Sequence, residues 1–432
     1  MVWLPHWPRI GEMTSIKLGL DRIKTLLQLL DNPEKKMPPA IHIAGTNGKG
    51  STTAFVRSIL EQAGLKAHVF TSPHLERFNE RIVLAGREIQ DDYLFSLLEE
   101  CRLVVEKNSL EISFFEGITV AAFLAFSRIE ADVVVLETGM GGRLDATNVL
   151  DRPLITIITP ISYDHTNVLG ESLTEIAIEK CGIMRQLSPC VVSMQTDEAA
   201  YAIEKFAENL GTLLIRYEYD YGVFLEDGKM RYKDHNLDIL IDPPSLPGYH
   251  QFVNAAASIA AVRAVYGARI TKDIIEQGVK KAFWKGRLQK ITSGLIYKKI
   301  PEEWEVWLDC AHNESGAQTL GAWLRDLPDI PTYLIFSMTR NRDVNKFLSH
   351  IDNLKRIICS DISSEPLGYK GRQIPPLIED EEKLKICEVV TSIEEAIDLI
   401  SRIDPDLKKK RIIIAGSMYL VSDFFRYNSL SA

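Results

Sequence analysis

Residues 44–52 combine side chains and spacing that suit the binding of a phosphate. Three glycines, one lysine and the adjacent hydroxyl residues Ser51 and Thr52 follow the apolar run 40–43, and a predicted helix over 51–63 begins here. Such a turn directs backbone N–H groups to one point, at the positive end of a helix dipole. Lys49 supplies charge for the outer phosphates, and Ser51 or Thr52 supplies a hydroxyl for Mg²⁺. We predict an ATP site here, the alternative being a glycine-rich turn with a solvated lysine.

The glycine spacing differs from that of the common nucleotide-binding loop. That loop has four residues between its first glycine and its Gly-Lys pair, whereas only Thr46 and Asn47 separate Gly45 from Gly48 and Lys49. The generic motif therefore fits imperfectly, and the flanking strand and helix carry the prediction.

Polar residues also follow other predicted strands. Ser72 lies in a Thr-Ser-Pro-His segment after one strand, and Glu137 ends another ahead of the glycine-rich segment 138–148. Loops at the carboxyl ends of strands converge on the ligand crevice of an open α/β sheet. A carboxylate at the end of an apolar strand needs a cation, and phosphate-bound Mg²⁺ would supply it. The alternatives are a Ser-Pro turn at Ser72 and an ion pair between Glu137 and Arg143.

A further group follows the predicted strand 154–158. Asp164 or His165 could orient or ligate a second metal. Lys180 lies on the next predicted helix, where a solvated helical lysine is the plain alternative.

Four polar residues stand out later in the chain. Asn254 opens a helix with an amide suited to a base or phosphate, and Arg287 lies in a suspected interdomain hinge. Asp309 and His312 follow the first strand of a second predicted domain. Each is explained equally well as a capping or hydrogen-bonding residue, but their recurrence at strand ends favours a site in the cleft between two domains.

Composition sets limits on the class of protein. The 432 residues are 46% apolar and 25% charged with a net charge of −9, which fits two or three globular domains and argues against a nucleic-acid partner. We expect no signal peptide and no membrane-spanning segment. The six cysteines include no CxxC pair, so free thiols in a reducing cytoplasm are expected.

Short β-branched runs alternate with amphipathic segments, a pattern typical of helices packed on a mostly parallel sheet. Residues 221–241 change to short alternating segments, which predicts an antiparallel meander appended to the sheet. We expect an α/β fold with a phosphate-loop domain over 1–292, followed by a smaller Rossmann-like α/β domain over 293–432.

The ordered set of motifs resembles the folylpolyglutamate synthase/dihydrofolate synthase family, relatives of the Mur peptide ligases. The segments that carry the resemblance are 45–51, 72–75, 141–148, 164–165, 179–180, 182–183, 250–251 with Asn254, 286–288, Asp309 with 311–313, and 416–417. They run through almost the whole chain and explain the shortened phosphate loop, and segment 141–148 is particularly specific to the folate branch.

The resemblance implies an ATP-dependent ligase in which a pterin-bound carboxylate becomes an acyl phosphate and glutamate then displaces phosphate. Glutamate addition to reduced folate is the first expectation, with dihydrofolate synthesis in the same site as a second activity. The alternatives are a dedicated dihydrofolate synthase, a Mur-type peptide ligase and a phosphate-loop phosphotransferase.

The resemblance also implies roles by position. ATP contacts would be Asn47, Gly48, Lys49, Gly50, Ser51, Asn254, Arg287 and Asp309, and Mg²⁺ ligands would be Ser72, Glu137 and His165. Lys180 would carry a carbamate, and His312 would lie near the transferred phosphoryl group. The folate site would involve Leu18, Gly19, Leu20, Phe115, Glu116, Leu144, Asp145 and Ala146. Two Mg²⁺ sites are expected with room for a monovalent cation, in a monomer whose partners are small molecules.

Three features depart from the family pattern. Cys181 and Cys310 stand where smaller residues are expected, and both are expected to be tolerated. Residues 339–343, Thr-Arg-Asn-Arg-Asp, replace a segment closer to Asp-Lys-Asp. The extra arginines bear on how glutamate or a polyglutamate tail is held, and they receive no assigned role here.

Overall fold

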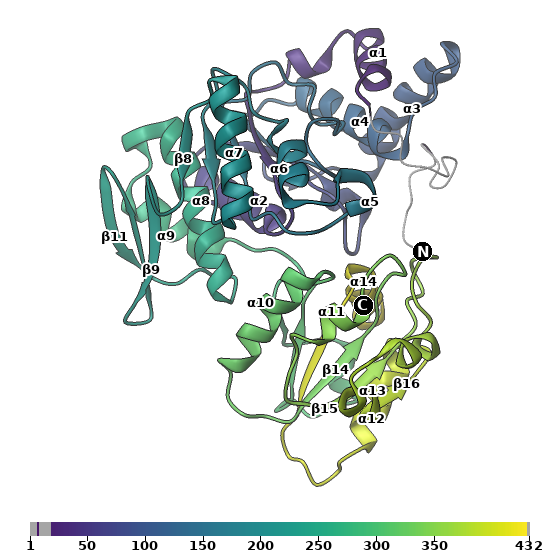
Figure 1. The fold of residues 1–432 in the computed structure, drawn as a ribbon. Coiled ribbons are helices and arrows are strands. Elements are labelled where there is room, and N and C mark those ends of the chain that lie inside the picture. The colour runs from purple at the N-terminus through teal and green to yellow at the C-terminus, as the bar shows by residue number, and fades with distance from the viewer. Residues whose placement is uncertain (1–6, 8–18, 430–432) are drawn as a thin grey trace. The chain divides into compact units, whose positions relative to one another are not determined.

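The computed structural model describes residue 7 and residues 19–429. The chain divides into two compact units, Met1–Ser245 with His250–Phe283, and Leu246–Tyr249 with Trp284–Ala432. Each unit contains its own sheet (Figure 1).

The first unit is built on an eight-stranded sheet in the order β4-β3-β2-β5-β1-β6-β7-β8. The strands are β1 (Ala40–Ala44), β2 (Ala67–Phe70), β3 (Ile82–Leu84), β4 (Arg87–Glu88), β5 (Val133–Glu137), β6 (Ile155–Ile158), β7 (Cys190–Val192) and β8 (Leu214–Arg216). All pairs from β2 to β8 are parallel, and β3 and β4 add an antiparallel hairpin at one edge. The central strands β1 and β5 are buried throughout, as expected of strands covered on both faces.

Helices cover both faces of this sheet (Figure 1). The helices are α1 (Asp21–Leu29), α2 (Lys49–Gln62), α3 (Asp91–Lys107), α4 (Phe114–Arg128), α5 (Thr166–Leu169), α6 (Leu173–Cys181), α7 (Asp197–Leu210), α8 (Tyr249–Tyr266) and α9 (Lys272–Lys281). Helices α1, α3 and α4 form one apolar cluster with β2 and β5. Helices α6 and α7 form a second cluster with the ends of β1 and β6. Helices α2 and α9 pack on each other.

The predicted meander forms a separate three-stranded antiparallel sheet. Its strands are β9 (Tyr221–Glu226), β10 (Lys229–Asp234) and β11 (Leu237–Ile241), in the order β11-β10-β9. It lies beside α9 (Figure 1), where Lys280 Nζ meets Asp242 Oδ2 at 3.1 Å.

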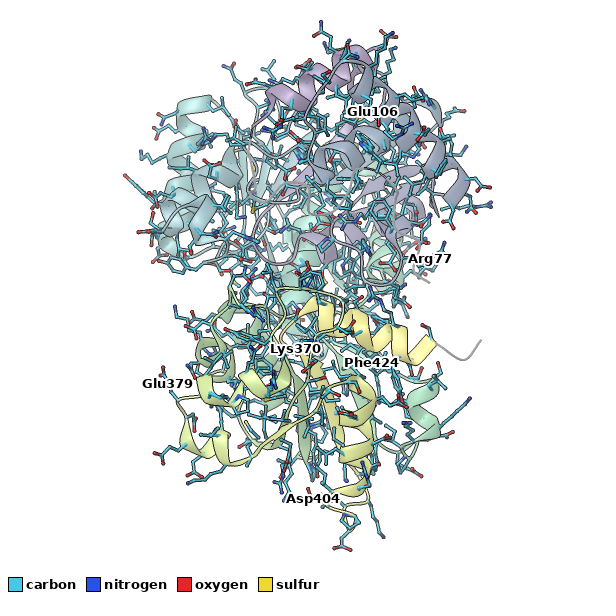
Figure 2. The ribbon with its side chains drawn as sticks, turned by 90° about the vertical axis from the view of Figure 1, so that its right-hand side faces the viewer. Arg77, Glu106, Lys370, Glu379, Asp404 and Phe424 are labelled. Carbon is cyan, nitrogen blue, oxygen red and sulfur yellow. The ribbon has the colours of Figure 1, made fainter. Side chains whose placement is uncertain are left out.

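The second unit is a six-stranded sheet in the order β12-β13-β17-β14-β15-β16. Its elements are β12 (Gln289–Ile291), β13 (Glu305–Leu308), α10 (Glu314–Arg325), β14 (Thr332–Phe336), α11 (Val344–Leu348), β15 (Leu354–Cys359), α12 (Glu381–Lys385), β16 (Cys387–Val389), α13 (Ile393–Arg402), β17 (Arg411–Ala415) and α14 (Met418–Ser429). Only β12 is antiparallel among these strands. Phe424 on α14, labelled in Figure 2, is fully buried.

The predicted fold class is confirmed by this architecture: two mainly parallel α/β sheets with a small antiparallel sheet between them in the chain. The predicted boundary after residue 292 falls just beyond β12, whereas the compact units separate at Phe283. Because β12 pairs with β13, residues 289–291 belong with the second sheet. Within the described residues, no helix is long and apolar enough to cross a membrane.

Candidate active site

The phosphate loop joins β1 to α2, and its glycines cannot carry side chains. At Gly45 a Cβ atom would lie 1.8 Å from Thr159 Oγ1. At Gly48, where φ is +84°, it would lie 2.6 Å from Asn254 Oδ1. Helix α2 begins at Lys49, so its first N–H groups lie at the end of the loop. This geometry suits an anion that approaches the backbone closely.

Two lysines meet on the loop. Lys49 Nζ donates to the carbonyl oxygens of Gly45 and Thr46 at 3.1 and 3.2 Å. Lys180 Nζ, from α6, donates to the same Gly45 oxygen at 2.8 Å. Two potential cations thus share one carbonyl oxygen, an arrangement that favours an anion nearby.

Lys180 is not the solvated helical lysine of the plain alternative, because its side chain is 3% exposed. Burial, with a smaller contribution from the charge of Lys49, lowers the pKa of Lys180 to about 7. The carboxylates of Asp164 and Asp145 act in the opposite direction. A large fraction of Lys180 is therefore a neutral amine near neutral pH.

Helix α8 supports the loop through a chain of side-chain amides. Gln251 Nε2 donates to Ser51 Oγ at 3.2 Å, and Asn254 Nδ2 donates to Gln251 Oε1 at 3.0 Å. Ser258 Oγ donates to the Thr52 carbonyl at 3.2 Å. Asn254 therefore lies against Gly48, and Gln251 holds its amide in place. Gln251 belongs to the matched segment 250–251, but the sequence prediction gave it no role.

Glu137 and Ser72 lie at the carboxyl edge of the sheet. Ile43 pairs with Glu137 in the parallel register, so the carboxylate stands beside the strand that leads into the phosphate loop. Phe70 pairs with Leu136, which places Ser72 two residues beyond the end of β2 at the same edge. Glu137 is 4% exposed. Arg143, its alternative partner, instead pairs with Glu179, with Nη2 2.5 Å from Oε1.

The loop after β6 is tied to the phosphate loop. Thr46 and Asn47 donate backbone N–H groups to the Pro160 carbonyl at 3.1 and 3.2 Å. The Asn47 side chain donates to Ser162 Oγ at 3.2 Å. His165, at the start of α5, has a positive φ of 50°, a backbone conformation that is costly outside glycine. Its Nε2 lies 3.6 Å from Asp164 Oδ1.

The donor atoms in this region fit a hard divalent cation. Hydroxyl oxygens of Ser51 and Ser72 and the carboxylate of Glu137 are oxygen ligands of the kind that Mg²⁺ prefers. Over residues 19–429, no group of three or more His, Cys, Asp and Glu side chains gathers to hold a metal. A cation here would complete its shell with phosphate and water oxygens, which is common for Mg²⁺.

The segment 141–148 packs tightly against the end of α6. A Cβ at Gly142 would lie 2.7 Å from the Lys180 carbonyl oxygen. Asp145 is buried, and it accepts from Met140 N at 2.8 Å and from the backbone and hydroxyl of Thr147 at 3.0 and 2.6 Å. Burial raises the pKa of Asp145, and these hydrogen bonds oppose the rise. Asp145 therefore organises its own loop.

A buried histidine on β1 completes this network. His42 Nε2 lies 2.8 Å from Thr147 Oγ1, whose hydrogen goes to Asp145, so Nε2 must be the donor. Burial lowers the pKa of His42 to about 3, which keeps the ring neutral. The sequence prediction missed His42 because a histidine inside an apolar strand resembles a core residue.

The predicted folate residues of the first unit differ in their contacts and in their burial. Glu116 caps α4 through Ser113 and pairs with Arg22, with Nη2 3.0 Å from Oε1. Phe115 presses on Gly139, where a Cβ would lie 2.5 Å from its ring. Leu20 packs on the cluster of α1, α3 and α4. Gly19 and Leu144 are partly exposed, Ala146 is buried beside Asp145, and Leu18 lies outside the described residues.

The second unit holds its own group of predicted residues after β13. Asp309 is buried and accepts from the backbone N–H groups of Leu288 and Ala311, both at 2.8 Å. Burial raises the pKa of Asp309, and the Arg287 guanidinium opposes the rise. His312 Nδ1 lies 2.9 Å from the Cys310 carbonyl oxygen. Because a carbonyl oxygen can only accept, Nδ1 is the donor, and Nε2 is left for another partner. The Asp309 carboxylate thus links the segment ahead of β12 to the turn that carries His312.

Residues 43–262 match the Mur ligase middle domain. With the phosphate loop and the two α/β units, this match places the chain among the proteins that share the Mur ligase middle domain. The chain is also 33% identical over 424 residues to the dihydrofolate synthase/folylpolyglutamate synthase of Bacillus subtilis, covering 95% of this chain and 94% of the relative. The chain belongs to the folylpolyglutamate synthase/dihydrofolate synthase family.

Solved structures of proteins with the same names also resemble this chain. Escherichia coli FolC in complex with DHPP and ADP has a TM-score of 0.84 and 28% identity, covering 96% of this chain and 94% of that one. A bifunctional folylpolyglutamate synthase/dihydrofolate synthase with Mn, AMPPNP and L-glutamate bound has a TM-score of 0.83 and 27% identity, covering 96% and 95%. The resemblance inferred from the motifs is confirmed.

Proposed function

We propose that this protein is an ATP-dependent ligase that adds L-glutamate to tetrahydrofolate, and that the same site also converts dihydropteroate to dihydrofolate. The names and bound ligands of its relatives support a nucleotide, a divalent metal and glutamate as participants. The observation that carries the proposal is the meeting of Lys49 and Lys180 on one loop carbonyl, with Glu137 in register beside that loop.

The phosphate loop would hold the triphosphate. Backbone N–H groups at Gly48 and Gly50 and the Lys49 ammonium would neutralise the outer phosphates, together with Asn47 and Ser51. Asn254, Arg287 and Asp309 are the proposed remaining ATP contacts.

Ser72, Glu137 and His165 are the proposed Mg²⁺ ligands at two sites, with room for a monovalent cation. Bound Mg²⁺ would neutralise phosphate charge and stabilise the charge that develops during transfer. Ser72 and Glu137 fit this role through their oxygen atoms and their common edge of the sheet. His165 would contribute from the loop that is tied to Thr46 and Asn47.

The reaction itself proceeds in two displacements. A carboxylate oxygen of the pterin-bearing acceptor attacks the γ-phosphorus of ATP, and ADP leaves, giving an acyl phosphate. The uncharged amine of glutamate then attacks the acyl carbon, the amide bond forms as the C–O bond to phosphate breaks, and inorganic phosphate and a proton leave. His312 is proposed to lie near the transferred phosphoryl group. The chain's contribution is positioning and charge neutralisation.

Lys180 is proposed to carry a carbamate. Its neutral amine would attack the carbon of CO₂ and release a proton, leaving an anion beside the Lys49 cation. Burial favours this chemistry because it holds the amine in its unprotonated, nucleophilic form.

The acceptor is proposed to lie against residues of the first unit: Leu18, Gly19, Leu20, Phe115, Glu116, Leu144, Asp145 and Ala146. The hydrogen bonds of Asp145 and Glu116 indicate that these two carboxylates act by fixing their loops. Residues 1–292 would thus bind folate and make most of the contacts to ATP, and residues 293–432, which include Asp309, would serve glutamate ligation, in a cytoplasmic monomer.

Assays of the purified protein with dihydropteroate and tetrahydrofolate side by side test the proposal. We expect ADP release that requires both an acceptor and glutamate, with both acceptors used. Turnover of dihydropteroate alone would leave a dedicated dihydrofolate synthase. ATP consumption without an amino acid would instead favour a phosphotransferase, and use of a peptidoglycan precursor a Mur-type peptide ligase.

A further inference from the structure

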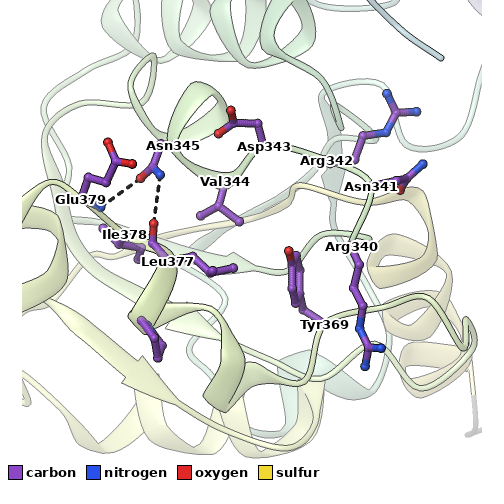
Figure 3. A pocket seen from close by; sticks show the side chains of 11 residues that line it. Arg340, Asn341, Arg342, Asp343, Val344, Asn345, Tyr369, Leu377, Ile378 and Glu379 are labelled. Carbon is purple, nitrogen blue, oxygen red and sulfur yellow. Dashed lines mark hydrogen bonds between the residues drawn. The ribbon is translucent and has the colours of Figure 1, made fainter. Parts of the chain in front are cut away.

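A pocket of about 700 Å³ in the second unit lies outside the roles assigned above (Figure 3). Its charges balance, because Arg340 and Arg342 are matched by Asp343 and Glu379, and both guanidinium groups point away from it (Figure 3). Nothing in this lining selects a ligand. A different set of unassigned side chains, in the first unit, holds the backbone that carries Lys180.

The last turn of α6 and the loop after β5 touch through their backbones. Arg143 N donates to the Glu179 carbonyl at 2.7 Å. A Cβ atom at Gly182 would collide with the Cβ of Arg143, and one at Gly142 would lie 2.7 Å from the Lys180 carbonyl oxygen. The loop therefore takes the place of solvent at the end of the helix, where carbonyl oxygens have no partner within the helix.

Two side chains, Asn148 and Arg185, lock this contact and are called the α6 clamp. Asn148 Nδ2, in a residue that is 5% exposed, spans the two segments by donating to the Gly182 carbonyl oxygen at 2.9 Å. Arg185 Nη2 donates to Asn148 Oδ1 at 2.9 Å. Arg185 Nη1 donates to the carbonyl oxygens of Gly182 and Met184 at 3.1 and 2.9 Å, and Nε donates to that of Leu150 at 3.2 Å. These acceptors are uncharged, so the planar guanidinium serves as a set of directed donors.

The α6 clamp bears on Lys180 because the amine of that residue has to reach the phosphate loop. Lys180 lies in the last turn of α6, and its Nζ donates to the Gly45 carbonyl at 2.8 Å. The charged groups that face the amine are Lys49, Asp164 and Asp145, which come from three other segments. A shift of the helix end by about 1 Å would break the bond to Gly45, and a misplacement of that size costs on the order of 100-fold in rate.

We propose that Arg185 and Asn148 are positioning residues of the ligase reaction, which fix the end of α6 on the loop after β5 and so hold the Lys180 amine at the phosphate loop. The proposal rests on the proposed function, since that function gives Lys180 its role. It predicts that loss of the α6 clamp releases Lys180 from Gly45, while the phosphate loop keeps its own contacts with α8.

The test is a double-mutant cycle on stability, because Lys180 reports its own burial. Free energies of unfolding are measured in CO₂-depleted buffer at pH 7 and pH 9 for the wild type, Lys180→Met, Arg185→Met and the double variant. Burial lowers the pKa of Lys180 to about 7, so Lys180→Met should be more stable than the wild type by a margin that narrows as pH rises. In the Arg185→Met background, where the amine can reach water, this margin should fall at least about twofold at pH 7 and lose most of its pH dependence.

Two further variants control this cycle. Asn148→Ser removes the α6 clamp from its other side and should reduce the margin in the same way, which keeps the test valid if Arg185→Met does not fold. Arg263→Met is the matched control, because Arg263 is also partly buried and ties α8 to β10, with Nε 2.8 Å from Asp234 Oδ2. Its loss should lower stability and leave the margin of Lys180→Met unchanged.

The same variants give a kinetic readout. Arg185→Met should lower kcat with tetrahydrofolate by at least about tenfold, with a KM for ATP within about threefold of the wild type because Lys49 and the loop N–H groups remain. An unchanged margin of Lys180→Met in either clamp variant would overturn the proposal, as would an equal loss in Arg263→Met or an unchanged kcat in Arg185→Met. Failure of the wild type to use any folate would refute the proposed function, while the stability cycle would still decide whether the α6 clamp holds Lys180.

Discussion

Replacing Lys180 by methionine should make the protein more stable and inactive at once. Methionine has a similar length and fills the same buried space without a charge to desolvate. The pKa of Lys180 falls from 10.5 to about 7 in the folded protein, because burial and Lys49 disfavour the ammonium. Between these two values the unfolded chain binds more protons, so the wild type gains stability as pH rises through this window. Below pH 7 the contribution of Lys180 is constant.

The magnitude follows from the width of that window. Holding Lys180 in the folded protein costs about 4 kcal/mol at pH 7 and about 2 kcal/mol at pH 9. The hydrogen bond from Lys180 to the Gly45 carbonyl offsets about 1 kcal/mol of this cost. Lys180→Met should therefore raise the free energy of unfolding by about 3 kcal/mol at pH 7, and by about 1 kcal/mol at pH 9.

The assay measures the free energy of unfolding of the wild type and of Lys180→Met by urea denaturation in CO₂-depleted buffer at pH 7 and pH 9. Hydrogen exchange in peptides that cover β1 and α2 then reports the local stability around Lys180. Added bicarbonate should raise the free energy of unfolding of the wild type, because it supplies the CO₂ that forms the carbamate. The methionine variant should show no such rise. The same difference in stability at pH 7 and pH 9 would refute the reasoning, as would a bicarbonate response retained by the methionine variant.

Three further predictions concern the residues around Lys180. Lys49→Ala should lower kcat by at least about a thousandfold at saturating ATP with an unchanged circular dichroism spectrum, since the charge that it neutralises grows during transfer; a wild-type kcat would remove Lys49 from the chemistry. Glu137→Gln and His165→Ala should each raise the Mg²⁺ concentration for half-maximal activity, and an unchanged midpoint in both would place the metal elsewhere. Thr147→Val should cost about 2 kcal/mol in thermal unfolding and raise the KM for the folate, because His42 and Asp145 lose a buried partner; an unaltered KM would separate this network from substrate binding.

The sequence predicted most of the fold because the central strands are strongly apolar and alternate with longer segments of helical pattern. The predicted strand 154–158 is β6 (Ile155–Ile158), and the predicted helix over 51–63 is α2 (Lys49–Gln62). Helix α1, the β3–β4 hairpin and β16 escaped prediction. They are short or weakly patterned, and the partly exposed β16 depends on its pairing with β15 for its conformation.

The candidate site divides along similar lines. The phosphate loop was predictable because a glycine-rich turn with one lysine stands between an apolar strand and a helix, although its glycine spacing differs from that of the common loop. The burial of Lys180 was not, since an isolated Glu-Lys pair on a helix looks the same whether the helix faces solvent or the loop. Gln251 and Thr147 lie in segments matched to the family, yet their contacts with Ser51 and His42 join parts far apart in the chain, which no local pattern marks.

The central claim is that the chain activates a carboxylate by phosphorylation before the amide forms. The most direct measurement uses tetrahydrofolate whose γ-carboxylate is labelled with ¹⁸O, followed by mass spectrometry of the released phosphate. The account predicts that one labelled oxygen appears in inorganic phosphate when the first glutamate is added to each labelled acceptor, and that no phosphate is released without glutamate. Unlabelled phosphate would contradict the acyl-phosphate route, because the acceptor oxygen would then never have bonded to phosphorus.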